Sequence, residues 1–454
     1  MATGRIIASI LLGLGTPTAS FASGYAISAA GAFGLGEVYA GIAAGGPSLS
    51  SMFFNPGTIT QHGSLAAEFD GTVILPRSST TVYGASRPRF LALPNSALTP
   101  TIDPSNPAPI TSPISLGTTQ SGNTTHAALV PAGYGVSRIS EDVFIGLAIN
   151  SPFGLSNKAA PTWSGRFHHI SAAIATYNAN PIIAYQVNNN LSLAAGIQVQ
   201  YIDGQLTTAS LLPIPNGVTP FGLASLETLS RFKGDDVGFG FTAGVTYATD
   251  RTILGLGFRS AVFHRLEGEA LNSVAGRLGS AAADVTNPEI VTASIRHQLN
   301  PQWTLNGTVQ WTNWSRYRSL VLEVENPLVA PVWTPGNWDD GWLISLGLEY
   351  AYSRTLSVRG GVGREISPIP IATRQPNIPD AGGIWVAAGL TYQVTNSMAL
   401  DISYSHLFAS DAKISLTDTA SPNLASNPNA VRGSLAAEAQ GHVDFLAVAL
   451  RYKL

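Results

Sequence analysis

Apolar and polar side chains alternate with a period of two along most of the chain. Because successive side chains of a strand point to opposite faces of a sheet, this alternation predicts β-strands whose two faces meet different surroundings. One face carries Leu, Ile, Val, Phe, Tyr and Trp, and the other carries mostly Gly, Ser, Thr, Ala and Gln. The clearest strands are predicted at 191–201, 237–247, 342–352, 384–394, 398–408 and 446–454.

Two folds produce such a pattern, a soluble β-sandwich and a membrane β-barrel. The outer faces of a sandwich usually carry many Lys and Glu, whereas the polar face here carries few charges. The apolar faces contain no charged residue, and a Lys or Arg facing lipid at mid-bilayer costs about 2–4 kcal/mol. Aromatic residues also recur at the ends of the apolar faces, as they do at membrane interfaces. The pattern therefore favours an all-β, antiparallel transmembrane barrel.

The connectors between strands alternate in length. Short polar turns are predicted at 139–142, 188–190, 249–251, 299–301, 353–355 and 395–397. Long Pro-, Ser- and Gly-bearing segments are predicted at 76–125, 151–171, 207–235, 269–287, 326–339, 367–382 and 417–437. Six short and seven long connectors make thirteen connections, and thus a fourteen-stranded barrel. Short periplasmic turns and longer outer loops are typical of bacterial outer-membrane barrels. The chain is long enough that several strands should project beyond the membrane.

The composition agrees with a surface that largely avoids water. Only 11% of the 454 residues are charged, against about 25% in an average soluble protein. The net charge of -3 leaves no basic excess to neutralise phosphates, so nucleic acid is not expected as a partner. The absence of cysteine excludes disulfides, a cysteine nucleophile and a cysteine-ligated metal.

Residues 1–22 have the features of a signal peptide. Arg5 supplies the positive start, residues 6–14 are apolar, and Ser20 and Ala22 place small residues where signal peptidase reads. The apolar stretch is shorter than the roughly 20 residues of a membrane helix. We therefore expect export from the cytoplasm and cleavage after Ala22.

Residues 23–63 do not alternate and are rich in small side chains. A barrel of fourteen strands without a plug would enclose an aqueous hole, since larger open barrels are channels. This segment is therefore predicted to fill the lumen as a plug, with the barrel at 64–454. The alternative is a periplasmic tail.

A series of short segments occurs in one order along nearly the whole mature chain. In this series the sequence resembles the outer-membrane long-chain fatty acid transporter family, the FadL type, which also includes channels for toluene and other hydrocarbons. The resemblance departs at Gly57, where the family usually has Ala, and at Leu454, where it usually ends in Phe. The matching segments are 34–41, Asn55-Pro56-Gly57, 163–168, 180–181, 191–201, 234–240, 258–260, 266–268, 311–315, 376–380, 405–408 and 411–413.

The resemblance implies a fourteen-stranded barrel with an N-terminal hatch in its lumen. It implies passive uptake of hydrophobic molecules, captured by extracellular loops and passed to a pocket near the hatch. It also implies lateral release at an inward kink of the third strand. Outer-membrane lipid and the barrel assembly machinery are then partners, and a monomer is expected.

The third strand begins near Val143 and reaches a segment that resists regular pairing, Asn150, Ser151, Pro152, Phe153 and Gly154. Proline lacks a backbone donor, and glycine tolerates unusual dihedral angles. The ladder should therefore break here, which supports a lateral opening at Asn150, Pro152, Phe153 and Gly154. Alternatively, Pro152 merely begins the next loop.

A fatty acid needs an apolar slot and one or two cations or donors for its carboxylate, whereas a hydrocarbon needs only the slot. The sequence leaves this choice open. Each arginine could instead be a lumen charge tied to a carboxylate elsewhere in the barrel. The apolar candidates for ligand binding are Phe33, Leu35, Phe53 and Phe54, and the candidate cations are Arg166, Arg259 and Arg359.

No enzymatic chemistry is expected. The sequence has no Gly-x-Ser-x-Gly elbow, and the adjacent His168 and His169 would point to opposite faces of a strand. We predict no catalytic residue, no metal site and no cofactor. Two non-enzymatic alternatives to transport of hydrophobic molecules are a barrel whose loops serve as an adhesin or phage receptor, and a hydrophilic porin.

Overall fold

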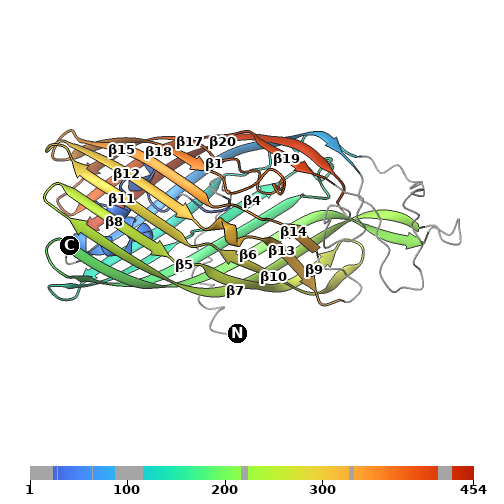
Figure 1. Ribbon diagram of the computed structural model, residues 1–454, viewed down its shortest axis with the longest axis horizontal. Coiled ribbons are helices and arrows are strands. Elements are labelled where there is room, and N and C mark those ends of the chain that lie inside the picture. Colours follow the sequence, from blue (N-terminus) through green and yellow to red (C-terminus); the bar gives the residue numbers. More distant parts are fainter. Residues whose placement is uncertain are drawn as a thin grey trace.

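The computed structural model describes residues 24–27, 29–63, 65–86, 116–215, 223–326, 332–417 and 432–453. The predicted signal peptide at 1–22 lies outside the described residues. The molecule is an elongated β-barrel that holds short helices in the half where the chain ends (Figure 1). None of the described helices is long and apolar enough to cross a bilayer.

The described strand segments form one antiparallel sheet that closes on itself as a barrel of fourteen strands. Closure occurs where β1 pairs with β20, from Ala66 opposite Lys453 to Ala85 opposite Leu435. Several transmembrane strands consist of two segments in succession: β3 with β4, β8 with β9, β10 with β11, β12 with β13, β14 with β15, and β18 with β19. The predicted fold class is therefore confirmed.

The segments have these bounds: β1 Leu65–Ala85, β2 Ala128–Arg138, β3 Val143–Asn150, β4 Gly154–Lys158, β5 Ser171–Gln186, β6 Leu191–Pro215, β7 Leu223–Ala248, β8 Thr252–Arg259, β9 Val262–Asn272, β10 Gly276–Asn287, β11 Ile290–Gln298, β12 Trp303–Thr312, β13 Ser319–Val324, β14 Val332–Pro335, β15 Gly341–Ala351, β16 Leu356–Ile366, β17 Gly383–Gln393, β18 Met398–Ala409, β19 Ala412–Leu416 and β20 Leu435–Lys453.

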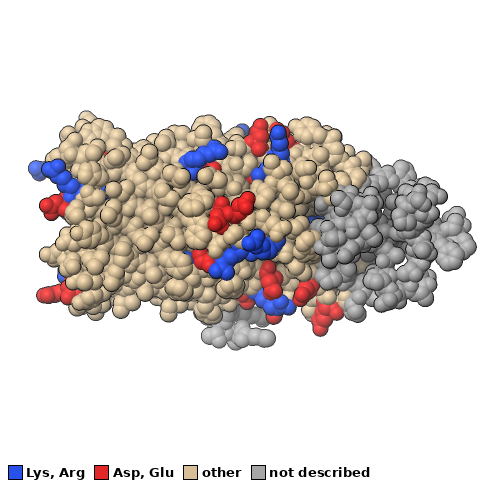
Figure 2. Space-filling model, viewed as in Figure 1, with Lys and Arg blue, Asp and Glu red and all other residues tan. Residues whose placement is uncertain are grey.

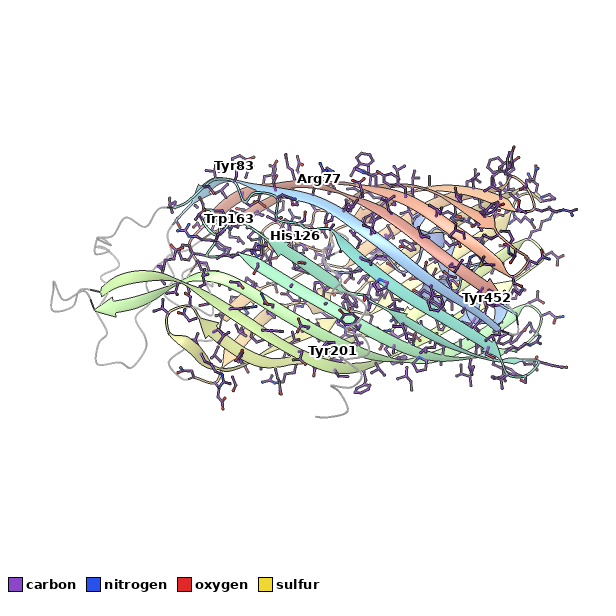
Figure 3. The ribbon with its side chains drawn as sticks, turned by 180° about the vertical axis from the view of Figure 1, so that it is seen from behind. Arg77, Tyr83, His126, Trp163, Tyr201 and Tyr452 are labelled. Carbon is purple, nitrogen blue, oxygen red and sulfur yellow. The ribbon has the colours of Figure 1, made fainter. Side chains whose placement is uncertain are left out.

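The period-two pattern separates lipid-facing from lumen-facing side chains. On β20, Leu446, Val448 and Leu450 are 42–50% exposed, whereas Ala447 and Ala449 between them are at most 1% exposed. Figure 2 shows the result on one face of the barrel, where charged side chains gather at the turn end and in the other half, with a largely uncharged band between. Tyr452 lies near the turn end and Tyr83 toward the opposite end (Figure 3).

All six predicted short turns lie between consecutive strands, but several predicted long loops are wrong in extent. Residues 76–85 continue β1, residues 207–215 and 223–235 belong to β6 and β7, and residues 276–287 form β10. Outside the bilayer both faces of a strand can be polar, so these extensions have the composition of loops. Figure 1 shows β6 and β7 reaching far beyond the other strands.

Of the predicted hatch at 23–63, residues 29–63 fold inside the lumen, and the name hatch refers to these residues from here on. The hatch contains two short α-helices and two 3-10 helices: α2 (Ala32–Leu35), η2 (Ile42–Ala44), α3 (Ser51–Phe54) and η3 (Pro56–Gln61). A further 3-10 helix, η4 (Trp314–Arg316), follows β12. Hatch side chains such as Leu35, Met52 and Ile59 share one buried apolar cluster with wall residues such as Tyr134 and Phe144. The hatch therefore packs as part of the barrel core.

Candidate functional site

The wall of the barrel holds the hatch by its backbone. Asp70 of β1 accepts a hydrogen bond from the Ala32 N–H at 2.8 Å, and Ser294 of β11 accepts one from the Ala43 N–H at 3.0 Å. In another contact the wall is the donor: the Arg451 side chain of β20 donates to the Pro47 carbonyl at 2.7 Å. Further wall side chains bonded to hatch backbone are Glu68, Tyr134, Arg259, Thr308, Arg359 and Ser403.

The Asn55-Pro56-Gly57 motif forms the joint between hatch and wall. The Asn55 amide donates to the Ala43 carbonyl at 2.6 Å and to the Val245 carbonyl of β7 at 2.8 Å. Its side-chain oxygen accepts from the Gly57 N–H at 2.9 Å, which caps η3. Pro56 occupies the first turn of η3, where its missing donor costs nothing. The motif thus links two parts of the hatch to β7.

Glycines in the wall let the hatch backbone approach. A Cβ atom at Gly255 would lie 1.8 Å from the Ala43 carbonyl oxygen, and one at Gly257 would lie 1.8 Å from that of Phe54. On β16, a Cβ at Gly361 would lie 2.4 Å from the Glu37 carbonyl oxygen. We call these wall glycines the seat of the hatch. The sequence analysis did not predict it. Its signal was present as glycines inside strands, which often mark close approach of another backbone.

The apolar candidates lie in packed interior. Leu35, Phe53 and Phe54 belong to the hatch cluster, with the Phe53 and Phe54 rings 4.9 Å apart. Phe33 instead lies among cations. The guanidinium of Arg359 is 4.3 Å from its ring centre, and those of Arg296 and Arg451 are 5.7 and 6.0 Å away.

The three candidate cations do not converge on one site. Arg359 pairs with Asp401 at 3.2 Å with both side chains fully buried, and it also donates to the Phe33 carbonyl. Arg166 lies in the loop between β4 and β5 and forms a bidentate pair with Glu227 at 2.6 and 2.9 Å. Both therefore have the carboxylate partner that the alternative interpretation expected.

Arg259 differs from the other two. It donates to the Phe53 carbonyl at 3.1 Å and to the Gln198 side-chain oxygen, and its guanidinium lies 4.3 Å from the Phe53 ring centre. The side chain is buried, yet no carboxylate of the described residues forms an ion pair with it.

The third strand, β3 followed by β4, is interrupted at 151–153. Asn150 is opposite Asn178 of β5, and pairing resumes with Gly154 opposite Ala175, so three residues of one strand face two of the other. All six residues of 150–155 are buried, whereas buried and exposed residues alternate along the rest of the wall. The segment therefore lies inward of the wall. Since pairing resumes at β4, Pro152 interrupts a strand and does not begin a loop.

The same segment leaves a gap toward β2. β2 and β3 pair from Arg138 opposite Phe144 up to Gly133 opposite Ile149. In the same register, Thr125 bridges Asn157 farther along. A continuous ladder would pair 128–132 with 150–154, and no such pairs occur between these described residues. We call this unpaired stretch the break.

Comparisons with known proteins agree with this architecture. A family model described as "Outer membrane protein transport protein (OMPP1/FadL/TodX)" matches residues 14–454. The chain belongs to this family. A long-chain fatty acid transport protein of Escherichia coli O157:H7 is 26% identical over 432 residues, covering 87% of this chain and 90% of the relative.

Solved structures of the FadL/TodX family have the same fold. A Pseudomonas aeruginosa FadL homologue superposes with a TM-score of 0.80 at 22% identity, covering 95% of this chain and all of the other. The Pseudomonas putida toluene transporter TodX superposes with a TM-score of 0.65 at 15% identity, covering 93% and 98%. The family is one of outer-membrane transport proteins, not enzymes, and this places the chain in the bacterial outer membrane.

Within this FadL/TodX-type barrel, an aromatic cluster lies against the break. The Tyr25 ring is 4.7 Å from Trp314 and 5.8 Å from Phe153, and Trp314 is 5.1 Å from Trp338. The backbone joins them as well, since the Ile27 N–H donates to the Pro152 carbonyl and the Gly154 N–H to the Tyr25 carbonyl, both at 2.9 Å. The sequence analysis did not assign Tyr25 or Trp314 to the site, although 311–315 was one of the family segments.

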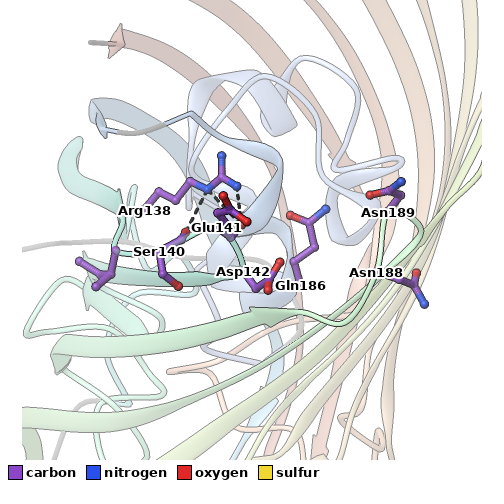
Figure 4. A pocket seen from close by; sticks show the side chains of 8 residues that line it. Arg138, Ser140, Glu141, Asp142, Gln186, Asn188 and Asn189 are labelled. Atoms are coloured by element: carbon purple, nitrogen blue, oxygen red, sulfur yellow. Dashed lines mark hydrogen bonds between the residues drawn. The ribbon is translucent and has the colours of Figure 1, made fainter.

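A hollow of about 480 Å³ on the outside of the molecule is of a different kind (Figure 4). It lies between two turns and is lined by polar groups such as Arg138, Glu141, Asp142 and Asn188. Its lining does not suit an apolar ligand. No group of side chains suited to hold a metal ion occurs among the described residues.

Proposed function

We propose that this chain carries hydrophobic small molecules, long-chain fatty acids or related hydrocarbons, passively across the outer membrane, and that they leave sideways through the break. Extracellular loops capture the molecule, and it passes to the aromatic cluster beside the hatch. The observation that carries the proposal is the unpaired stretch between β2 and the third strand, next to a hatch that is bonded around its circumference.

A lateral exit follows from the physics of the wall. Unpaired backbone groups facing lipid cost several kcal/mol each, so an open ladder persists only where it is buried or lines a cavity. The inward turn of 150–155 meets this condition, because the segment is buried and part of its backbone bonds to Tyr25 and Ile27. An apolar molecule leaving here enters hydrocarbon directly and avoids the water of the periplasm.

A vertical exit is disfavoured by the bonds of the hatch. Passing straight through the lumen would require the hatch to release wall side chains on β1, β11, β12, β16, β18 and β20. Each buried group left without its partner costs about 1–3 kcal/mol. Since uptake is passive, no energy source is at hand to break so many bonds at once.

Straightening the third strand tests the proposal. Deletion of Pro152 removes the extra residue, so that β3 and β4 pair with β5 in one register. We expect uptake of labelled dodecanoate and toluene by cells that carry the deletion to fall to the level of cells without the protein. The matched control is Pro152→Ala, which keeps the residue count and therefore the break, and it should retain uptake. A deletion variant that folds, is exported and still transports both compounds would refute lateral release.

A further inference from the structure

Three amide side chains lie side by side at the break, on neighbouring strands. The register places Asn150 of β3 opposite Asn178 of β5, and Asn178 opposite Gln200 of β6. All three are at most 3% exposed, and they occupy lumen-facing positions. We call Asn150, Asn178 and Gln200 the amide row.

Most polar atoms of the amide row have no partner. Both amide atoms of Asn150, both of Asn178 and the nitrogen of Gln200 form no hydrogen bond with any described residue. Roughly nine in ten buried polar groups in proteins are hydrogen-bonded, and an unmade bond costs about 1–3 kcal/mol. Two adjacent asparagines with every side-chain bond unmade therefore need an explanation.

The next layer of the wall shows that the fold can satisfy the same side chains. Two residues along the same strands, nearer the hatch, lie Asn180 and Gln198. Asn180 donates to the Ile197 carbonyl at 2.8 Å, and Gln198 donates to the Phe241 carbonyl at 3.1 Å. Those two amides are structural. Asn150 and Asn178 of the amide row are equally buried but form no side-chain bond with a described residue, and Gln200 is bonded through its oxygen only. Unused donors and acceptors of this kind are what a site for an exchangeable ligand requires.

The neighbours of the amide row define the shape of the ligand. On one side, Phe153 of the break packs against Tyr25 and Trp314 in a buried apolar cluster, whose rings a bound tail would have to part. In the adjacent layer, Arg259 provides a buried positive charge. Its guanidinium donates to the Gln198 side chain and has no carboxylate partner among the described residues. The imidazole of His264 lies beside the amide row, where it bonds to the Gln200 oxygen at 3.1 Å and to Asp236 at 3.0 Å.

We propose that the amide row binds the carboxyl head of an amphipathic substrate at the lateral exit, with its chain on the aromatic cluster. This inference rests on the proposed function and deepens it, because it selects long-chain carboxylic acids over plain hydrocarbons as the preferred substrates. Amides offer donors and acceptors to a carboxyl group in either protonation state, and the charge of Arg259 favours the anion. Toluene has no polar group that could pair with the amides.

Replacement of the amides by leucine tests the assignment. In the full mature chain, purified in a non-ionic detergent, Asn178→Leu and the double variant Asn150→Leu/Asn178→Leu are compared by equilibrium dialysis with labelled dodecanoate and labelled toluene. We expect dodecanoate to bind about tenfold more weakly, the loss of one or two hydrogen bonds, with toluene binding unchanged. The heat stability of the barrel should stay equal or rise, because leucine needs no buried partner.

The matched control is Ser405→Ala on β18, which removes a buried lumen hydroxyl that lies away from the break and has no partner among the described residues. It should bind both compounds as the unmodified protein does. Unchanged dodecanoate binding in the leucine variants would overturn the proposal, and so would an equal loss for both compounds. If the unmodified protein binds neither compound, the proposed function itself fails. If it binds both, and the leucine variants show no loss that is specific to dodecanoate, the amide row alone is refuted.

Discussion

A methyl group at position 257 would lie 1.8 Å from the carbonyl oxygen of Phe54 and 2.8 Å from the Asn55 Cα. Both contacts are with backbone, so no side chain can turn aside to relieve them. Glycine is therefore required here by the closeness of the hatch and not by backbone dihedral angles. The hatch backbone can lie this close to β8 because Gly255 and Gly257 have no side chain.

We predict that Gly257→Ala loosens the hatch and makes the barrel leak. The displaced α3 would also lose the bond from Arg259 to the Phe53 carbonyl. Ion conductance in planar bilayers should rise clearly above that of the unmodified protein. The control is Gly135→Ala in β2, where the added methyl meets nothing within 4 Å. Equal conductance of the two variants would contradict the role of this glycine.

Sequence reasoning reached part of the chemistry of single residues. It named Arg166, Arg259 and Arg359 as candidate cations for a ligand carboxylate, with a lumen charge tied to a carboxylate elsewhere in the barrel as the alternative. It could not assign partners, because Arg359 pairs with Asp401 on another strand and Arg166 with Glu227 in a distant segment. Of these three arginines, Arg259 alone has no carboxylate partner among the described residues, and this depends on the fold.

At the scale of elements, the period-two pattern was sufficient inside the membrane and insufficient outside it. Every strand predicted from alternation is present, because lipid on one side and the hatch on the other impose different chemistry on the two faces. β6 and β7 pair from Leu191 opposite Tyr247 to Pro215 opposite Leu223, and so they remain paired beyond the bilayer, where their composition resembles that of loops. The interruption of the third strand was predictable from Pro152, but its unpaired flank on β2 was not.

The loop between β4 and β5 contains two histidines that burial keeps neutral. Removal from water lowers the pKa of both His168 and His169 from 6.5 to about 3. The loop is fixed around them, since the Trp163 indole donates to the His169 carbonyl at 2.7 Å. His168 also bonds through its ring to the Gly433 carbonyl at 3.0 Å.

We predict that acid opens this loop. In the open state the imidazoles take up protons near pH 6.5, whereas in the closed loop they do not until about pH 3. The closed form is therefore fully stable above about pH 6.5 and loses stability as the pH falls toward 3. Hydrogen exchange of residues 159–170, corrected for its intrinsic pH dependence, should be faster at pH 4.5 than at pH 7.

The matched variant is His168→Gln/His169→Gln, whose amides cannot take up a proton in this range. Its exchange in 159–170 should be independent of pH after the same correction. Acid sensitivity of equal size in this variant would show that other groups control the loop.

At the scale of the whole molecule, the hatch and barrel form one folded unit. The hatch comes from residues 29–63, yet the side chains that hold it belong to strands from β1 to β20. Alternation, loop lengths and the family segments together predicted the barrel and a plug inside it. They could not predict how the plug is held, because most of these contacts join positions that are far apart in the sequence, such as Gly41 and Thr308.

A hatch that stays in place throughout transport can be tested with a covalent tether. A Cβ at Gly347 would lie 3.0 Å from the Cβ of Ala40, a little closer than the roughly 3.5–4.5 Å of a disulfide. The chain has no cysteine of its own, so Ala40→Cys/Gly347→Cys introduces one defined pair. We predict that uptake of dodecanoate is the same with the tether oxidised and after its reduction with dithiothreitol, because the route that we propose, through the break, does not require the hatch to move.

Each single substitution, Ala40→Cys and Gly347→Cys, controls for damage to the seat, since neither can form the tether. Mass spectrometry of the chain after alkylation establishes that the disulfide has formed. Release through the floor of the barrel requires the hatch to leave its bonds to Asp70, Ser294 and Arg451, and the tether would prevent this. Uptake that is lost on oxidation and restored on reduction would therefore assign the exit to a moving hatch, and the break would then have no part in release.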